Sequence, residues 1–211
     1  AEDGITKTTY TITTNLGTPP TLIAATTNND VEHNFDITFT DDSYWRSKIT
    51  SVKWGDDVLS AADYSIANAT LTVKPTAGNS VFRTAGTKTV TVIADEFNNA
   101  TVSQELKAGS INAANSVTSL NTPFVKSGTS SVKFVAKDQY NNLVSGYAGQ
   151  IDIVVNNTNS AINESYTINS VAYTASTNDV SLGNTNASGE FTFDVVIPST
   201  VDVGDGFSIQ V

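Results

Sequence analysis

The sequence predicts an all-β protein made of two antiparallel β-sandwich domains, and three observations lead to this prediction. Apolar residues make up only 39% of the chain, below the roughly 45 to 50% of an average globular domain. Thr, Ser, Asn and Val are abundant, as expected of many short strands joined by polar turns. The 211 residues also exceed the usual single domain, which has roughly 100 to 150 residues.

The clearest strand and corner lie at residues 132–144, VKFVAKDQYNNLV. Val132, Phe134 and Ala136 recur at every second position, which is the pattern of a strand with one buried face. Residues 138–142 then supply turn formers, including two Asn residues that accept positive φ. A strand that breaks at an acidic, Asn-rich corner is the repeating unit of an antiparallel sandwich.

Similar patterns predict the remaining strands. In the first half, the predicted strands are residues 8–15, 21–27, 35–39, 49–54, 61–66, 71–74, 87–94 and 100–106. In the second half, they are residues 123–126, 131–137, 150–155, 165–173, 191–197 and 207–211. Segments 156–163 and 176–188 are rich in Asn, Ser and Thr and are predicted to be solvated loops.

One short segment, residues 41–48 (DDSYWRSK), departs from the strand pattern. Asp42 and Ser43 are both suited to cap a single helical turn. Such a turn would set Trp45 against the sheet and leave one of the neighbouring aromatic side chains, Tyr44 or Trp45, facing outward. The sequence therefore predicts one helical turn within an otherwise all-β domain.

The best candidate for a linker is residues 107–115, KAGSINAAN, where Ile111 is the only large apolar residue. This places one domain at residues 1–108 and the other at 109–211. The two halves share a strand-rich composition but show no residue-by-residue repeat. We therefore expect tandem modules of different subtype.

Two stretches of the sequence resemble immunoglobulin-like domains of bacterial surface proteins. DQYNNLV is similar to the D-Q-Y-G-N-x-V corner of repeats in S-layer (surface-layer) proteins and invasin-type adhesins. The first half resembles a module of S-layer proteins of the Gram-positive Bacillus and Lysinibacillus type, and departs from it at Asp56 and at Asn98-Asn99. The matching residues are Val52, Trp54, Gly55, Leu59, Tyr64, Ala85, Gly86, Val90, Val92, Ala94 and Phe97. This resemblance implies two tandem immunoglobulin-like sandwiches, an extracellular location on the bacterial surface, and calcium-assisted assembly.

The charge and composition exclude several classes of partner. The formal net charge is −10, whereas a nucleic-acid-binding protein needs Lys and Arg to neutralise phosphates. No apolar run approaches the ~20 residues that span a bilayer, so we expect no membrane insertion. The chain has no Cys, and hence neither disulfides nor thiolate metal sites.

Several carboxylates fall at predicted strand ends and are candidate calcium ligands. Calcium prefers several oxygen ligands, which acidic corners with Asn and backbone carbonyls can supply. The candidates are Asp41, Asp42, Asp95, Glu96 and Asp138. The alternative is that these residues are turn formers on an acidic protein, and none has the spacing of an EF-hand loop.

No residue pattern indicates catalysis. His33 is the only histidine and has no Cys or second His with which to form a triad or a zinc site. The adjacent pair Asp41 and Asp42 lacks the cleft-building insertions that a glycosidase needs. Trp45 and Trp54 would suit sugar stacking, but they are more readily explained as core anchors. We therefore expect no enzyme and no catalytic residues.

The leading hypothesis is a structural fragment of an S-layer protein. Its partners would be neighbouring copies in a two-dimensional lattice on the cell wall and adjacent domains of a longer chain. The start at Ala1 without Met or signal peptide also suggests an internal piece of a longer protein. Two alternatives stay open: spacer domains of an adhesin stalk, and an accessory module of a secreted glycan-degrading enzyme.

Overall fold

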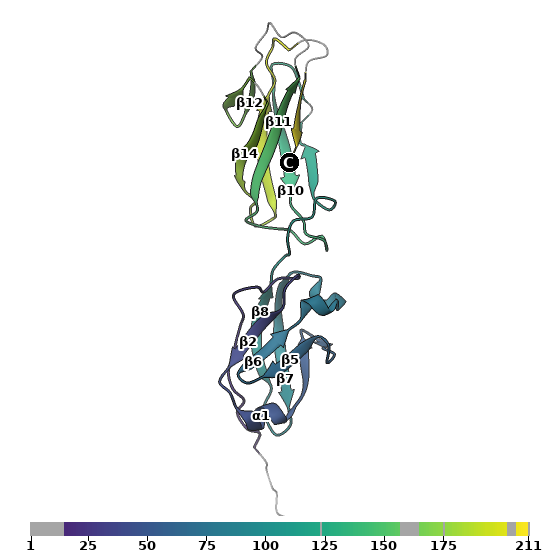
Figure 1. The fold of residues 1–211 in the computed structure, drawn as a ribbon, viewed down its shortest axis with the longest axis vertical. Helices are drawn as coiled ribbons and strands as arrows, with labels where there is room; N and C mark the ends of the chain where they lie inside the picture. The colour runs from purple at the N-terminus through teal and green to yellow at the C-terminus, as the bar shows by residue number, and fades with distance from the viewer. Residues whose placement is uncertain (1–14, 123, 157–164, 175, 202–205, 211) are drawn as a thin grey trace, which may run out of the picture. The chain divides into compact units, whose positions relative to one another are not determined.

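The computed structural model describes residues 15–122, 124–156, 165–174, 176–201 and 206–210 (Figure 1). The chain forms two compact units. Unit 1 comprises Ala1–Asn29, His33–Val81 and Gly86–Glu105, and unit 2 comprises Asp30–Glu32, Phe82–Ala85 and Leu106–Val211. The predicted domain boundary between residues 108 and 109 stays a prediction.

The described residues of unit 1 form two four-stranded sheets. The first has the order β1-β2-β6-β5, formed by Leu22–Ile23, Phe35–Phe39, Thr70–Val73 and Tyr64–Ala67. The second has the order β4-β3-β7-β8, formed by Asp57–Val58, Ile49–Trp54, Gly86–Ala94 and Ala100–Leu106. A short helix, α1 (Ser43–Ser47), and two 3₁₀ turns, Pro75–Ala77 and Ser80–Phe82, lie in the connections.

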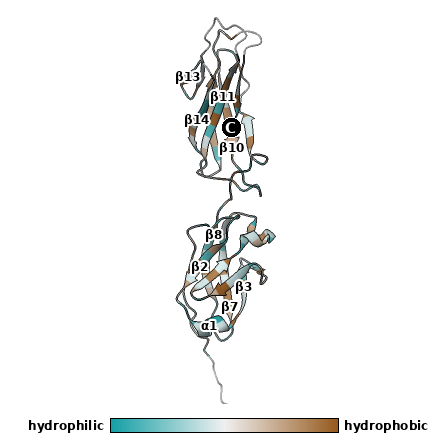
Figure 2. Cartoon of the chain, viewed as in Figure 1, coloured by the Kyte–Doolittle hydropathy of each residue, from teal (hydrophilic) through white to brown (hydrophobic). Residues whose placement is uncertain are grey.

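The alternation of side chains along the strands explains how unit 1 builds its core. In β2, Phe35, Ile37 and Phe39 are buried, whereas Asp36 and Thr38 are exposed. The strand pairs antiparallel with β6, so buried residues face buried residues across the ladder. Hydrophobic and hydrophilic positions alternate along the strands in the same way in Figure 2. The core therefore lies between the two sheets.

In the part of unit 2 that the structure describes, the strands form a five-stranded and a three-stranded sheet. The larger has the order β13-β12-β15-β10-β9, formed by Val171–Tyr173, Tyr166–Ile168, Glu190–Val196, Thr129–Val135 and Val117–Leu120. The smaller has the order β14-β11-β16, formed by Thr177–Asn184, Ala148–Asn156 and Gly206–Gln210.

The core of unit 2 combines aromatic and aliphatic side chains of the larger sheet with aliphatic side chains of the smaller one. Phe134 of β10 is paired in register with Phe191 of β15, and the two rings lie 4.9 Å apart between centroids. Ile151 and Ile153 of β11 complete the cluster from the smaller sheet. Both units are thus two-layered antiparallel sandwiches, and the prediction of an all-β fold is confirmed.

The strand order identifies the sandwich type. In an immunoglobulin-like domain the first, second, fifth and fourth strands form one sheet, and the third, sixth and seventh form the other. Unit 1 follows this order once the short β4 is set aside as an added edge strand. The predicted immunoglobulin-like fold is confirmed by this topology.

Several predicted element boundaries were wrong. Segment 176–188 contains the strand β14 instead of a loop, and its polar side chains are explained by its position at a sheet edge. Residues 165–173 form a hairpin, because Asn169 and Ser170 adopt positive φ between β12 and β13. The strand expected at 123–126 lies earlier, at β9. The strand predicted at 8–15 falls almost wholly outside the described residues, and the predicted loop 156–163 does so apart from its first residue.

Candidate functional site

The acidic residues named from the sequence lie at helix ends and turns, as Asp42 illustrates. Asp42 is the N-cap of α1: its φ of −136° is extended, and its Oδ1 accepts a hydrogen bond from the Trp45 amide at 3.0 Å. This bond satisfies one of the amides that a helix start leaves without a partner. The cap sets Trp45 into the core, where its ring meets Phe39 edge-on at 5.1 Å. The predicted helical turn and its cap are confirmed.

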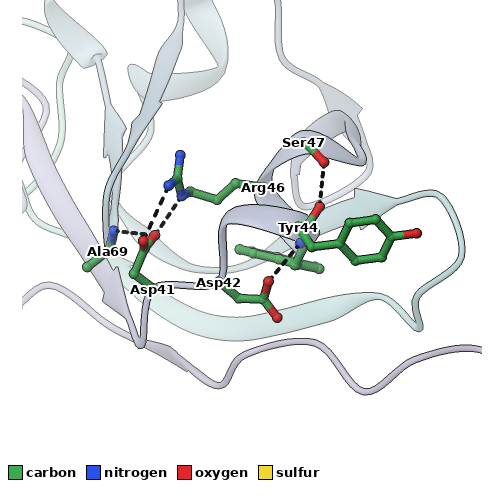
Figure 3. A network of polar contacts seen from close by, with 7 residues as sticks. Asp41, Asp42, Tyr44, Arg46, Ser47 and Ala69 are labelled. Atoms are coloured by element: carbon green, nitrogen blue, oxygen red, sulfur yellow. Dashed lines mark hydrogen bonds and ion pairs between the residues drawn. The ribbon is translucent and has the colours of Figure 1, made fainter.

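Asp41 accepts hydrogen bonds from an arginine of α1 (Figure 3). Arg46 donates to its carboxylate through Nε at 2.6 Å and Nη2 at 3.3 Å, and the Ala69 amide donates at 3.2 Å. The hydrogen bonds from Arg46 hold the pKa of Asp41 below its usual value. The carboxylate joins α1 to the turn between β5 and β6, so its position is explained without a metal.

Glu96 lies in the connection between β7 and β8 and contacts Tyr44 of α1 and the C-cap residue Lys48. It accepts a 2.6 Å hydrogen bond from Lys48 Nζ and a 2.5 Å bond from the Tyr44 hydroxyl. The Lys48 ammonium lowers the pKa of Glu96, and Glu96 raises that of Lys48. The φ of Glu96 is +70°, a conformation rare for a residue with a side chain.

These contacts hold an aromatic side chain at the surface of unit 1. The Tyr44 ring lies 5.9 Å from the Phe97 ring and 5.2 Å from Lys48 Nζ, yet Tyr44 remains 55% exposed. We call Tyr44, Lys48, Glu96 and Phe97 the Tyr44 cluster. It is a fixed aromatic surface, which is an arrangement suited to contact another protein.

Asp138, the candidate in unit 2, is fully buried. Its carboxylate accepts four hydrogen bonds: from the amides of Gly109, Tyr140 and Asn142, and from the Asn142 side chain, at 2.8 to 3.0 Å. Burying a carboxylate is costly unless it is fully hydrogen-bonded, and here both oxygens have two donors. Asp138 therefore fixes the corner that follows β10.

The structure does not gather the five candidates into a single site. Asp41, Asp42 and Glu96 all serve α1 in unit 1, Asp95 is exposed on the same connection as Glu96, and Asp138 belongs to unit 2. Among the described residues, no group of three or more His, Cys, Asp and Glu side chains is placed to hold a metal ion. Calcium binding stays a prediction.

One buried carboxylate was missed in the sequence. Asp63 is 3% exposed and accepts from the Ser60 amide at 2.8 Å, the Ser60 hydroxyl at 2.7 Å and Asn79 Nδ2 at 2.9 Å. Burial raises the pKa of Asp63, but the hydrogen bonds from Ser60 and Asn79 outweigh it, so the pKa is lowered overall. The Ser three residues before Asp63 was the only local signal.

The tryptophans are core residues. Trp45 and Trp54 are 0% and 1% exposed, so neither ring is accessible for stacking on a sugar. His33 is exposed, outside the buried core.

A surface hollow of about 490 Å³ lies beside Asp41 and Asp42 and is lined by Thr18, Pro19, Pro20, Thr40 and Ser43. No helix in the described part of the chain is long and apolar enough to cross a membrane.

The fold and these corners define a class: immunoglobulin-like sandwich modules whose acidic residues secure turns and caps. Residues 22–107 match a protein-family model described as "Heme-binding protein Shr-like, Hb-interacting domain". A comparison with curated proteins gave no match.

Solved structures with a similar fold include domains of bacterial surface proteins and modules of endo-beta-1,4-glucanases. The Escherichia coli adhesin FdeC is 15% identical, with a TM-score of 0.49 over 90% of this chain and 57% of that one. Invasin, described as a bacterial integrin-binding protein, is 19% identical, with a TM-score of 0.48 over 90% and 36%. Domains 4 and 5 of the S-layer protein SbsC are 15% identical, with a TM-score of 0.37 over 93% and 92%. The chain thus spans little more than half of the FdeC structure and about a third of the invasin structure.

Proposed function

We propose that this chain is a structural part of an extracellular bacterial surface protein, in which rigid sandwich modules act as building blocks. The observation that carries the proposal is the use of the acidic corners. Asp42 caps α1, Asp41 is paired with Arg46, and Asp138 is enclosed by four donors. Carboxylates committed in this way stabilise turns and serve no reaction. The net charge of −10 suits an exported module.

The more specific form of the proposal is an S-layer subunit that assembles laterally with copies of itself. Exposed carboxylates such as Asp95 would repel between neighbours, and calcium would offset this repulsion. The test is electron microscopy of the 211-residue chain on a supported surface, with calcium, with magnesium, and with chelator. We expect ordered arrays with calcium alone. Dispersed molecules in all three conditions would contradict lattice assembly and leave the adhesin spacer as the better proposal.

Thermal melting separates calcium binding from assembly. A cation that binds only the folded state raises the melting temperature, and the increase grows with the logarithm of the cation concentration once this exceeds the dissociation constant. We expect calcium to raise the melting temperature of the dilute chain and chelator to reverse the change. If the melting temperature is the same with calcium and with chelator, bound calcium is removed from the proposal.

A second candidate function is recognition of haemoglobin by unit 1. The match of residues 22–107 to a family described as haemoglobin-interacting favours it, as does the exposed Tyr44 cluster within that range. Tyr44→Ala removes the ring, Tyr44→Phe keeps the ring but loses the hydroxyl bond to Glu96, and Val58→Ala alters an exposed residue outside the cluster.

Binding of haemoglobin to immobilised chain tests this candidate. If the ring makes the contact, Tyr44→Ala weakens binding about tenfold or more, whereas Val58→Ala does not. Tyr44→Phe distinguishes the ring from the hydroxyl. No binding by the unaltered chain, or equal binding by all variants, would contradict a role for the Tyr44 cluster.

A further inference from the structure

The surface hollow beside the start of α1 has polar walls. Its volume of about 490 Å³ lies within the roughly 300 to 1,000 Å³ of small-molecule sites. The walls carry three hydroxyl groups (Thr18, Thr40 and Ser43), two carboxylates (Asp41 and Asp42) and two proline rings. The three hydroxyl groups belong to exposed residues and make no hydrogen bond to the described residues. They are therefore available to donate to a ligand and to accept from it.

One of the two carboxylates is held in place and still has an oxygen available. Asp42 accepts the Trp45 amide through Oδ1, whereas its Oδ2 accepts no hydrogen bond from the described part of the chain. Asp41 is instead bonded to Arg46. Figure 3 shows the Asp42 carboxylate on the same side of the start of α1 as the Tyr44 ring, and Asp41 on the other side. Asp42 Oδ2 is thus an oriented acceptor in the wall of the hollow.

An aromatic ring lies next to the hollow and is fixed to the same part of the unit. Tyr44 belongs to α1, whose first residue lines the hollow, and it is 55% exposed. The opposite wall at Thr18 is joined to the Tyr44 cluster, because the preceding Gly17 donates its amide to the Glu96 carbonyl at 2.8 Å. A Cβ at Gly17 would lie 2.8 Å from the Phe97 ring, so glycine allows this close contact. The ring and the hollow therefore form one fixed surface.

The chemistry of this surface selects an uncharged ligand that carries several hydroxyl groups. Carboxylates repel anions, and polar walls are costly to cover with a wholly apolar ligand. A cation finds little uncompensated charge, because Arg46 is paired with Asp41 and Lys48 with Glu96. A sugar ring has an apolar C–H face for the aromatic ring and hydroxyl groups for the polar walls.

We propose that the hollow and the exposed Tyr44 ring form a binding site for a neutral glycan. The Tyr44 ring stacks on one sugar ring, Asp42 Oδ2 accepts a hydrogen bond from a sugar hydroxyl, and the hydroxyl groups of Thr18, Thr40 and Ser43 bond to others. All of these residues belong to unit 1. The site adds a ligand-binding function to the structural role proposed above, and its aromatic platform is a tyrosine, since both tryptophans are buried.

A glycan array tests the class of ligand. The labelled 211-residue chain is applied to neutral glycans of bacterial walls, neutral glycans of animal cells, and sialylated or sulfated glycans. We expect binding to neutral glycans alone, and the source of those that bind distinguishes a wall ligand from a host ligand. The neutral oligosaccharide that binds best is then titrated into the chain and followed by NMR. We expect the amide signals of residues 18 and 40–44 to shift, and the titration gives the dissociation constant.

Two pairs of variants separate the acceptor from the ring. Asp42→Asn keeps an oxygen that can cap α1 but replaces Oδ2 with an NH₂ group that donates, so we expect an unchanged melting temperature and about tenfold weaker binding or more. Its matched control is Asp57→Asn on β4, an exposed carboxylate outside the hollow, which should leave the affinity unchanged. Tyr44→Ala should weaken binding by about tenfold or more, whereas Tyr44→Phe keeps the ring and the binding.

Salt distinguishes a glycan from a basic protein segment as the occupant. The affinity for a neutral glycan should be the same at about 50 mM and about 500 mM NaCl, whereas binding that depends on charge weakens with salt. Three results would overturn the proposal: binding to no glycan or to acidic glycans only, equal affinity of Asp42→Asn and Asp57→Asn, and loss of binding in salt. These titrations contain no haemoglobin and use the dilute chain, so their outcome is separate from that of haemoglobin recognition and of lattice assembly.

Discussion

Replacing Asp138 should destabilise unit 2 and leave the stability of unit 1 unchanged. The side chain is fully buried and its two oxygens accept four hydrogen bonds, three of them from backbone amides. Asp138→Ala leaves these donors without an acceptor in a site closed to water. A buried polar group deprived of its partner costs about 1 to 3 kcal/mol. Because the corner can relax to satisfy some of the donors, we expect a loss of about 3 to 5 kcal/mol.

Asp138→Asn gives a graded version of the same change. The amide oxygen can still accept from Tyr140 and Asn142 in place of Oδ1. The amide nitrogen then faces the Gly109 amide and the Asn142 side chain, which are both donors. Two bonds are lost and donors face each other, so we expect a loss of about 2 to 4 kcal/mol, smaller than that for alanine.

The two units can be followed separately in one sample. Both tryptophans, Trp45 and Trp54, belong to unit 1, so urea unfolding read by tryptophan fluorescence reports that unit. Hydrogen exchange of the amides in β10 and β15 reports unit 2. We expect the fluorescence midpoint to stay constant while exchange in β10 and β15 accelerates. A loss of less than about 1 kcal/mol for Asp138→Ala would refute the reasoning that the carboxylate holds the corner.

Two further predictions concern unit 1. Asp42→Ala removes the N-cap of α1 and should cost about 1 kcal/mol in the fluorescence transition, whereas Asp42→Ser keeps a capping oxygen and should restore most of it; equal losses for both would show that the cap is unimportant. The pKa of Asp63 is lowered in the folded state, so its contribution to stability is present above the unfolded pKa of about 3.9 and is lost as pH falls through the lower folded value. Urea unfolding from pH 7 to pH 2 should therefore show a smaller decline below about pH 4 for Asp63→Asn than for the unaltered chain. Parallel curves for the two proteins would contradict this.

The elements predicted well were those whose signal lies within a few residues. Residues 35–39 were predicted as a strand, and β2 has these bounds, because alternation alone determines which side chains face the core. The turn at α1 was also predicted, since the capping Asp42 lies directly before it. The corner at 138–142 was predicted from its turn formers, one of which, Asn141, has a φ of +68°.

The roles of the carboxylates could not be predicted in the same way. Asp41 and Glu96 were both named as calcium candidates because each follows a strand. Glu96 is 48 residues away in sequence from its partner Lys48. In the fold, α1 brings Arg46 to Asp41 and Lys48 to Glu96, so each acid has a cationic partner. β14 was missed because a polar edge strand has the composition of a loop.

The sequence by itself determined that the chain is all-β, where most strands lie, and that its corners are acidic, because alternation and turn chemistry act between near neighbours. Only the tertiary structure decided which strands share a sheet and that the amide of Gly109, 29 residues away, donates to Asp138. These properties arise from pairing between segments far apart in the chain, and a local pattern carries no record of such pairing.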